Sequence, residues 1–137
     1  MMAIVHATQE ALPALRQSQG SVVNISSIAA LHPAARQPPY GAIKAAVIHY
    51  TITQAAMYAK DRVRVNCIAP GSIEFPGGVW DRRKTENPTL YNATLASIPF
   101  GRMGYAEEVA NVALFLASPL ASWVTGQAIA VAGAQGL

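Results

Sequence analysis

The sequence predicts an α/β fold, a short parallel sheet of about three strands with helices on its faces. Segments typical of helices alternate with short runs rich in Val and Ile, the order expected when helices connect parallel strands. The 137 residues suit one domain and are too few for a complete doubly wound sheet of two βαβαβ halves. Hydrophobic residues make up 52% and charged residues 12%, a balance that predicts a real core and excludes a long disordered chain.

The first half of the chain predicts two helices around one strand. Residues 1–19 carry apolar side chains at helical spacing, and Gly20 supplies a stop. Residues 21–25 are a short run rich in Val and Ile, which predicts a strand buried on both faces. Three prolines mark residues 29–39 as a loop, and good helix formers then fill residues 40–60.

The second half predicts two more strands and two more helices. Apolar and polar residues alternate over residues 62–68, which indicates a strand, and Pro70 then breaks the chain. A short helix is expected over residues 88–98. A longer one is expected over residues 106–117, whose first turn holds two glutamates that suit the positive end of the helix dipole. Residues 127–132 predict the third strand. Strands separated by helices should lie parallel, with right-handed crossovers.

The charge pattern predicts no nucleic-acid partner. Ten Lys and Arg against seven Asp and Glu leave a net charge of +3. The only basic run, Arg82, Arg83 and Lys84, fits either a solvated loop or a phosphate-binding patch, and no aromatic platform accompanies it. The three histidines lack the spacing of metal ligands, so no metal site is expected.

Cys67 is the only cysteine, so no intramolecular disulfide can form, which fits a reducing compartment such as the cytoplasm. Its apolar neighbours Val65 and Ile68 predict a buried side chain rather than a nucleophile. No apolar run reaches transmembrane length, and no secretory signal precedes the first helix. We therefore expect residues 1–137 to form a single cytoplasmic domain with no membrane partner.

Tyr40 and Lys44 are the strongest candidates for chemistry. They lie four residues apart on a predicted helix, so their side chains share one face about one turn apart. A lysine ammonium beside a phenol favours the phenolate, and such a tyrosine can act as a general acid or base. The same spacing also describes an ordinary helix surface, so the interpretation depends on the residues around the pair.

Polar and turn-forming residues follow the first two predicted strands. Ligands in open α/β sheets bind outside the carboxyl ends of the strands, where Ser26 and Ser27 follow the first strand. A serine hydroxyl there suits a hydrogen bond to a substrate oxygen, and the alternative is a turn or helix cap. We expect one crevice to hold Ser27, Tyr40, Lys44 and residues 70–74.

Several motifs in a fixed order carry a family resemblance. They are GSVVNISS at residues 20–27, YGAIK at residues 40–44 and RVNCIAPG at residues 64–71, followed by PFGRMG, EEVA and TGQ downstream. Together they resemble the carboxyl-terminal half of a short-chain dehydrogenase/reductase, and they extend over nearly the whole chain. The resemblance implies a partial Rossmann-like fold. It is specific for the family and not for the substrate.

The resemblance also implies residue roles. Ser27, thirteen residues before Tyr40, matches the serine that orients the substrate carbonyl or hydroxyl. Tyr40 matches the acid/base that exchanges a proton with that oxygen. Lys44 matches the lysine that holds the nicotinamide ribose and favours the ionised tyrosine. The implied cofactor is NAD or NADP, and the residues implied to lie around it are Tyr40, Lys44, Pro70, Gly71 and Ile73.

Several family features have no counterpart in the sequence. The glycine-rich turn that cradles the pyrophosphate is absent, as is the residue that selects NAD or NADP. The family's catalytic asparagine would fall at or before Met1. Phe75 stands where a threonine is common, and residues 132–134 stand where Asp-Gly-Gly is usual. Asn66 looks structural. We therefore expect weak cofactor binding, if any, by this chain alone.

Two functions from different classes follow. In the first, the chain is an oxidoreductase that transfers hydride between an alcohol and a carbonyl, or the catalytic half of one that a nucleotide-binding partner complements. Little or no activity is expected of the chain alone. In the second, it is a non-catalytic association module that kept the family's interface helices. Either way a homo-oligomer is expected, because the strand at residues 21–25 would present an open edge.

Overall fold

A three-stranded parallel sheet lies at the centre of the computed structural model, which describes residues 1–137. The strands are β1 (Ser21–Ile25), β2 (Arg64–Pro70) and β3 (Ala128–Val131), in the order β1-β2-β3. In the register, Ile68 of β2 lies opposite Ile25 of β1 and Ile129 of β3. The expected α/β fold with three parallel strands and flanking helices is confirmed.

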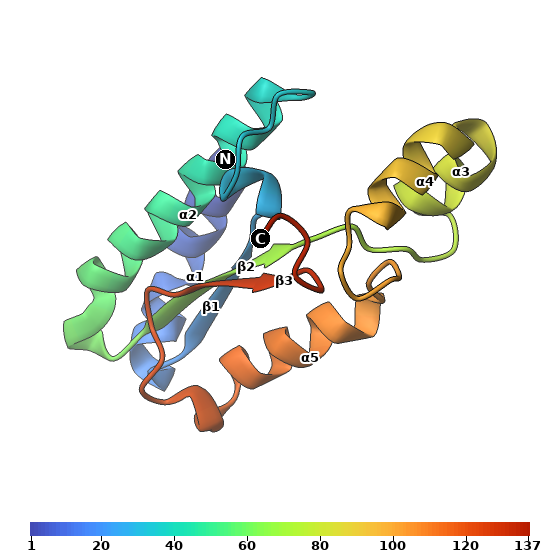
Figure 1. Cartoon of the computed structure of the whole chain (residues 1–137). Helices are drawn as coiled ribbons and strands as arrows, with labels where there is room; N and C mark the ends of the chain where they lie inside the picture. Colours follow the sequence, from blue (N-terminus) through green and yellow to red (C-terminus); the bar gives the residue numbers. More distant parts are fainter.

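Helices cover both faces of the sheet (Figure 1). α1 (Met2–Ser18) and α2 (Pro38–Tyr58) lie on one face, and α5 (Ala106–Ala117) lies on the other. α3 (Val79–Glu86) and α4 (Pro88–Ala96) form a pair that projects beyond the carboxyl end of β2. Three short 3₁₀ turns complete the chain, namely η1 (Ile28–Ala30), η2 (Ala59–Asp61) and η3 (Pro119–Ala121).

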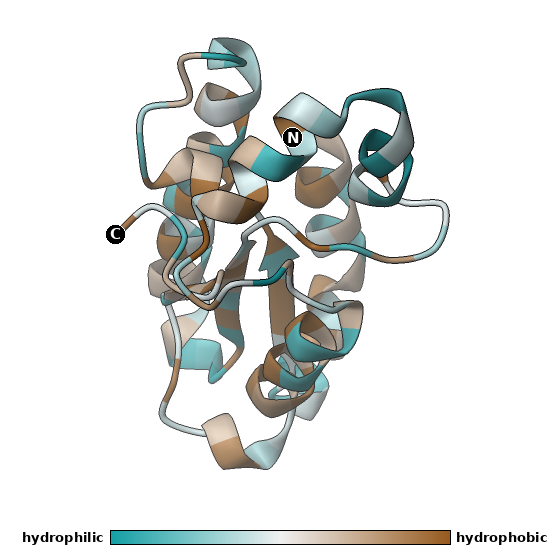
Figure 2. Ribbon diagram, turned by 45° about the vertical axis from the view of Figure 1, so that its right-hand side comes forward, coloured by the Kyte–Doolittle hydropathy of each residue, from teal (hydrophilic) through white to brown (hydrophobic).

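The core lies between the sheet and the layer formed by α1 and α2. Buried side chains from the end of α2 and the start of β2 meet there, and α1 adds two leucines; the set is Ala55, Tyr58, Val63, Val65, Leu12 and Leu15. Residues 65–69 of β2 are all buried, because β2 has a strand on each side and helices on both faces. Figure 2 shows apolar residues along the strands and on the helix surfaces next to them.

The expectation that the strand at residues 21–25 is buried on both faces is wrong. Of its residues only Asn24 is buried, and Ile25 is 45% exposed. The reason is its place in the sheet, because β1 pairs only with β2 and its other edge has no strand beside it. Burial therefore distinguishes the central strand from the edge strand, although both are rich in apolar residues.

Two predicted boundaries move by two residues for identifiable reasons. α2 begins at Pro38, because a proline is well suited to the first turn of a helix, where its missing N–H is not needed. β2 begins at Arg64, because Arg62 has a left-handed conformation with φ of 56° and the N–H of Val63 donates to the carbonyl of Tyr58. Both residues thus belong to the turn that ends η2.

α3 was absent from the sequence-based prediction. Its sequence, VWDRRKTE, lacks an apolar face at helical spacing, so nothing in the pattern distinguishes it from a loop. The basic run therefore lies on a helix, not in a solvated loop. Asp81 in the first turn of α3 accepts a hydrogen bond from the N–H of Gly77 at 2.8 Å, which ties the helix to the glycine turn before it.

Cys67 lies in the middle of β2 and is fully buried with a free thiol, which confirms the sequence-based expectation. Burial raises the pKa of this thiol and so disfavours the reactive thiolate. No helix is both long enough and apolar enough to span a membrane.

Candidate active site

Three hydrogen bonds hold the end of β1, one to β2 and two to α2. Ser26 directly follows β1, and its N–H donates to the carbonyl of Ile68 at 2.7 Å. Its hydroxyl donates to the carbonyl of Lys44 at 2.7 Å. In return, Lys44 Nζ donates to the carbonyl of Ile25 at 3.1 Å. The end of the first strand is therefore fixed against the first turns of α2.

Tyr40 and Lys44 lie on the same face of α2, as their spacing predicts. Lys44 Nζ is 5.7 Å from the centre of the Tyr40 ring, within the range of a cation–π contact. Tyr40 is 42% exposed, and its hydroxyl makes no hydrogen bond within the chain. The phenol can therefore reach an external oxygen while its ring stays beside the ammonium group.

Ser27 occupies the N-cap of η1, and its hydroxyl oxygen accepts a hydrogen bond from the N–H of Ala29 at 3.2 Å. The alternative of a helix cap is therefore observed. A cap uses a lone pair of the serine oxygen and leaves the hydroxyl hydrogen free to donate. The cap thus fixes the Ser27 side chain without consuming the group that a substrate oxygen would need.

The loop that follows β2 is closed by backbone hydrogen bonds. The N–H of Gly71 donates to the carbonyl of Val131 at 3.0 Å. Gly104 then pairs with the loop twice, donating to the carbonyl of Ser72 and accepting from the N–H of Glu74, both at 2.9 Å. Ile73 lies between these bonds, and neither its N–H nor its C=O takes part in a backbone hydrogen bond. One residue of a fixed loop thus keeps both backbone groups available.

Gly71 is required by close packing. A Cβ at this position would lie 2.9 Å from the Cα of Ala132 and 2.9 Å from the side-chain oxygen of Gln135. Real Cβ atoms do not approach backbone so closely, so any other residue would push the loop away from β3. The Pro-Gly motif therefore sets how tightly the loop lies against the end of the chain.

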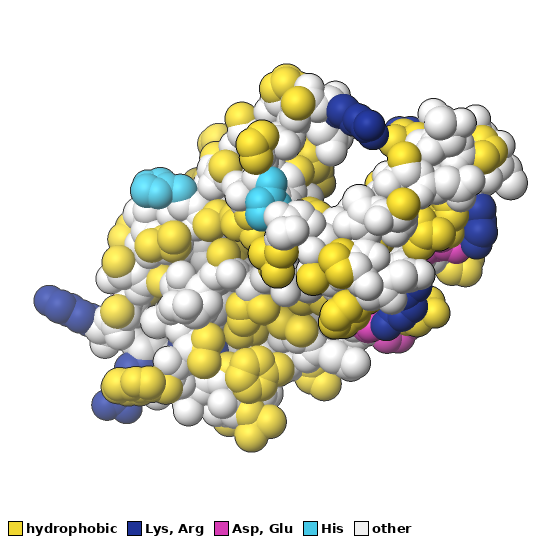
Figure 3. Space-filling model, viewed as in Figure 1, with side chains coloured by type: hydrophobic (Ala, Val, Ile, Leu, Met, Phe, Trp, Pro, Cys, Tyr) yellow, Lys and Arg dark blue, Asp and Glu magenta, His cyan; other side chains and the backbone are white.

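The predicted site residues fall into two groups. The hydrogen bonds above join Lys44 to the end of β1, and the register places that end beside β2, two residues before Pro70. No hydrogen bond joins Ser27 or Tyr40 to residues 70–74. Figure 3 shows the surface hollowed between the segment that leads into α2 and the α3–α4 pair.

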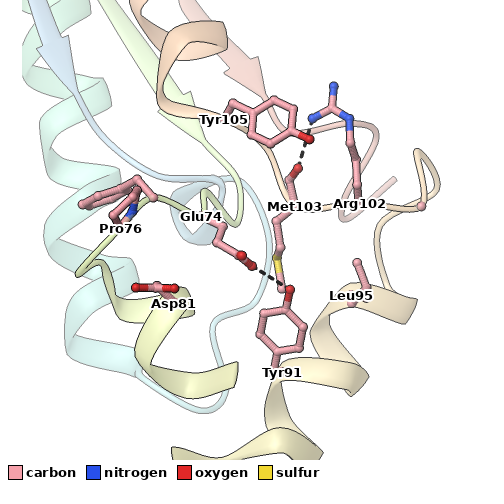
Figure 4. Close-up of a pocket in the computed structure, with 10 residues that line it drawn as sticks. Glu74, Pro76, Asp81, Tyr91, Leu95, Arg102, Met103 and Tyr105 are labelled. Atoms are coloured by element: carbon pink, nitrogen blue, oxygen red, sulfur yellow. Dashed lines mark hydrogen bonds between the residues drawn. The ribbon is translucent and has the colours of Figure 1, made fainter. Parts of the chain in front are cut away.

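A pocket of about 470 Å³ lies between the loop after β2 and the α3–α4 pair (Figure 4). On its wall Glu74 accepts a hydrogen bond from the Tyr91 hydroxyl at 2.6 Å and one from Lys84 Nζ at 2.8 Å. These bonds, with that of Lys84 the stronger cause, hold the pKa of Glu74 below its usual value. Lys84 also lies 5.5 Å from the Tyr91 ring centre, so the three side chains form one cluster.

A second charged cluster flanks the same pocket. The Arg102 guanidinium donates to both carboxylate oxygens of Glu108, at 2.6 and 2.9 Å, and lies 4.5 Å from the ring centre of Tyr105. These bonds, together with one from the N–H of Tyr105, lower the pKa of Glu108 to about 2. Sequence reasoning assigned neither cluster. The only signal was that PFGRMG and EEVA belong to the family pattern.

Sequence and structure comparisons agree on one family. A family model described as enoyl-(acyl carrier protein) reductase matches residues 1–134. A 3-oxoacyl-[acyl-carrier-protein] reductase from Thermotoga maritima is 43% identical over 133 residues, which are 95% of this chain and 51% of that protein. A solved short-chain type dehydrogenase/reductase from Mycobacterium ulcerans gives a TM-score of 0.86 at 36% identity, covering 96% of this chain and 47% of that one.

A dehydrogenase from Agrobacterium tumefaciens, solved with bound NADP, gives a TM-score of 0.84 at 33% identity and covers 97% of this chain and 54% of that one. The chain therefore belongs to the short-chain dehydrogenase/reductase family of NAD(P)-dependent oxidoreductases. It spans about half the length of the curated relatives it matches.

Proposed function

We propose that this chain supplies the acid/base half of a short-chain dehydrogenase/reductase that interconverts an alcohol and a carbonyl. The observation that carries the proposal is the junction of β1 and α2. There Lys44 Nζ donates a hydrogen bond to the end of β1 and lies 5.7 Å from the ring centre of an exposed Tyr40. The matched family motifs give this arrangement its chemical meaning.

Each side chain has one task in the reaction. Tyr40 gives a proton to the carbonyl oxygen during reduction and takes it from the alcohol during oxidation. Ser27 donates its free hydroxyl hydrogen to the same oxygen and so orients it. The Lys44 ammonium stabilises the phenolate that Tyr40 becomes when its proton leaves. The hydrogen bond from Lys44 to Ile25 keeps that charge in place throughout.

The residues present fit the nicotinamide end of a cofactor. A carboxamide has one acceptor and one donor group, and Ile73 offers an unpaired N–H and an unpaired C=O on a fixed loop. Lys44 Nζ has one protein acceptor, which leaves further donors for ribose hydroxyls. We therefore assign Ile73 and Lys44 to hold this end, with Tyr40, Pro70 and Gly71 around it. When bound, the cofactor supplies or accepts the hydride.

The phosphate end has no counterpart within residues 1–137. The chain contains no strand followed by a glycine-rich helix start, which is the feature that cradles a pyrophosphate. We therefore propose that a nucleotide-binding segment completes the enzyme and that this chain alone binds NAD(H) or NADP(H) weakly. Calorimetric titration of the chain with NADH and with NADPH tests this, and micromolar affinity for either would contradict it.

The test of the acid/base assignment is Tyr40→Phe. In any preparation with reductase activity, whether the chain alone or the chain with a nucleotide-binding segment, the substitution should reduce kcat about 10²–10⁴-fold, because the proton donor is lost. The ring and its contact with Lys44 are kept, so the fold should not change. Tyr50→Phe, on the same helix, is the matched control. Unchanged turnover in Tyr40→Phe would remove Tyr40 from the mechanism.

A specific observation favours the second function, a module for association. The outer edge of β1 has no strand beside it, so its backbone groups are open to pairing. On α2 the apolar residues Ile43, Ile52 and Met57 are 53%, 47% and 62% exposed. Figure 3 shows further apolar side chains over α5 and the segment that follows it. We therefore propose that the chain forms a homo-oligomer, with a symmetric dimer as the default.

Light scattering at several concentrations tests the oligomer. A dimer through β1 and the helices beside it should show twice the mass of the 14.4 kDa chain, with the fraction of dimer rising with concentration. Ile52→Glu should weaken the association because a charge would be buried on that face. A stable monomer at high micromolar concentration would contradict the proposal.

A further inference from the structure

We propose that Gln135 is a positioning residue for the loop after β2, which carries Ile73. We also propose that residues 132–137 connect the two walls of the candidate site. One wall is this loop, and the other is the segment that runs from Ser27 to Tyr40. The proposal rests on the proposed function, because it concerns the loop that carries Ile73. It assigns a task to Gln135, which none of the matched family motifs contains.

One side chain makes three hydrogen bonds across the loop. The N–H of Ser72 donates to Gln135 Oε1 at 2.9 Å. Gln135 Nε2 donates to the Ser72 hydroxyl at 3.1 Å and, more weakly, to the Ser97 hydroxyl at 3.4 Å. Both polar atoms of the Gln135 amide therefore hydrogen-bond to Ser72. The amide nitrogen also reaches Ser97, the C-cap residue of α4. No other contact satisfies the Ser72 N–H.

The backbone of the terminal segment is shaped to present this side chain. Gly133, Ala134 and Gly136 all have left-handed conformations, with φ of 56°, 64° and 90°. Ala134 is the costly member, because a residue with a Cβ adopts this region rarely. The N–H of Gln135 donates to the carbonyl of Ala132 at 3.0 Å and closes the turn. Strain of this kind persists only where surrounding contacts hold it.

The same segment touches the other wall of the site. A Cβ on Gly136 would come within 2.7 Å of the His32 ring, so the two lie in close contact. His32 belongs to the segment that leads from Ser27 into α2. The terminal segment thus contacts both the approach to Tyr40 and the loop after β2, two regions that no hydrogen bond joins directly.

The consequence for the reaction concerns Ile73. It lies directly after Ser72, and its free N–H and C=O are the groups assigned to the carboxamide. Gly104 fixes the loop through the Ser72 carbonyl and the Glu74 N–H, whereas Gln135 is what holds the Ser72 N–H. Removing the Gln135 amide should therefore loosen the Gly71–Ser72 peptide, and with it the path of the chain into Ile73, while the sheet behind it stays intact.

The experiment measures amide hydrogen exchange by NMR in the isolated chain, without cofactor. Gln135→Met keeps the length of the side chain and removes both polar atoms. We expect the Ser72 amide to exchange about three- to tenfold faster, the range for loss of one net hydrogen bond. Gln135→Glu keeps an acceptor for that N–H and should restore exchange to within about twofold of the parent. The Ile68 amide in β2 should be unchanged in both variants.

The matched control is Gln127→Met, because Gln127 Nε2 donates only to the carbonyl of Thr125 on the surface. The proposal is overturned if Ser72 exchange is unchanged in Gln135→Met, or if Gln135→Glu behaves like Gln135→Met. It is also overturned if Ile68 accelerates as much as Ser72, since that shows general destabilisation. Failure of the proposed function would appear in the Tyr40→Phe measurement, whereas failure of the Gln135 proposal appears in Ser72 exchange.

Discussion

The two walls of the candidate site differ in how completely the chain builds them. The loop after β2 is bonded to β3, to Gly104, to Gln135 and, through Glu74, to the α3–α4 pair. The opposite wall has Tyr40 with a free hydroxyl and 42% exposure, on a helix that exposes several apolar side chains. The loop after β2 is the fixed wall, because internal contacts hold it. The opposite wall is held only where Lys44 joins the end of β1, and its outer surface is open.

Position in the sheet explains this difference. The loop continues from β2, the central strand, so packing reaches it from both sides. Ser27 and Tyr40 follow β1, which has a neighbour on one side only. The wall that carries Ser27 and Tyr40 therefore has room for further structure beside it. The two partners proposed above, a nucleotide-binding segment and a second copy of the chain, would both use that side, so the proposals predict that one excludes the other.

The largest loss of stability should come from Asn66→Ala, because Asn66 lies on β2, the strand that leads into the fixed wall. Its Nδ2 donates to the carbonyl of Val124 at 2.8 Å, and its Oδ1 accepts from the N–H of Gln127 at 3.0 Å. The residue is fully buried, so Asn66→Ala leaves two backbone groups unpaired without water. We expect a loss of roughly 2–5 kcal/mol in the free energy of unfolding.

Urea unfolding followed by circular dichroism measures this loss. Asn92→Ala is the matched control, since Asn92 is exposed on α4 and alanine is a good helix former. A change below about 0.5 kcal/mol for Asn66→Ala would show that Asn66 does not support the sheet. The sequence indicated a structural role for Asn66, and the two hydrogen bonds confirm it. The unfolding measurement would show how much stability that role contributes.

The sheet was predictable because its signals are local. Residues 21–25 match β1, and the expected helix at residues 106–117 matches α5. Runs of Val and Ile and helical spacing act over a few residues, so they can be seen without the fold. The burial of β1 was not predictable in the same way. It depends on whether another strand lies beside it, and a run of five residues does not carry that information.

The candidate site likewise combines contacts that local spacing predicts with contacts that depend on the whole fold. Tyr40 and Lys44 share a helix, so spacing alone places them on one face. Gln135 and Ser72 are 63 positions apart, and Tyr91 is 17 positions from Glu74. Glutamine, serine and tyrosine occur widely on protein surfaces, and their pairing here follows from how the loop, α4 and the chain end pack together. Such contacts become visible only in three dimensions.

A smaller effect should come from loosening the link between the fixed wall and the α3–α4 pair. Glu74→Gln removes the charge that attracts Lys84 and weakens the short bond from Tyr91. Because the Lys84 side chain is exposed, most of the effect comes from the Tyr91 bond. We expect the free energy of unfolding to fall by about 1 kcal/mol. Urea unfolding tests this, with Glu86→Gln on α3 as a control for the loss of one charge. Equal effects of the two substitutions would contradict a specific link.

The smallest effect is a pH dependence at the far side of the same pocket. The bonds from Arg102 and the Tyr105 N–H lower the pKa of Glu108 from 4.5 to about 2 in the folded chain. A lowered pKa means that the fold favours the carboxylate. The contribution of Glu108 to stability is therefore present above about pH 4.5 and is lost as the pH falls toward 2. The side chains of Arg102 and Glu108 are 43% and 39% exposed, so solvent screens the pair and keeps the effect small.

Glu108→Gln separates this contribution from the general effect of acid. The variant cannot titrate at position 108, so its thermal midpoint should fall less than that of the parent between pH 5 and pH 2. Near neutral pH the parent should be the more stable of the two, and the difference should close as the carboxylate is protonated. Glu107→Gln is the matched control, because it removes the same charge from the same turn of α5 without touching the Arg102 pair. Parallel curves for the parent and Glu108→Gln would show that the pair contributes nothing to acid stability, and Glu74 with Lys84 would then be the remaining ion pair of the fixed wall.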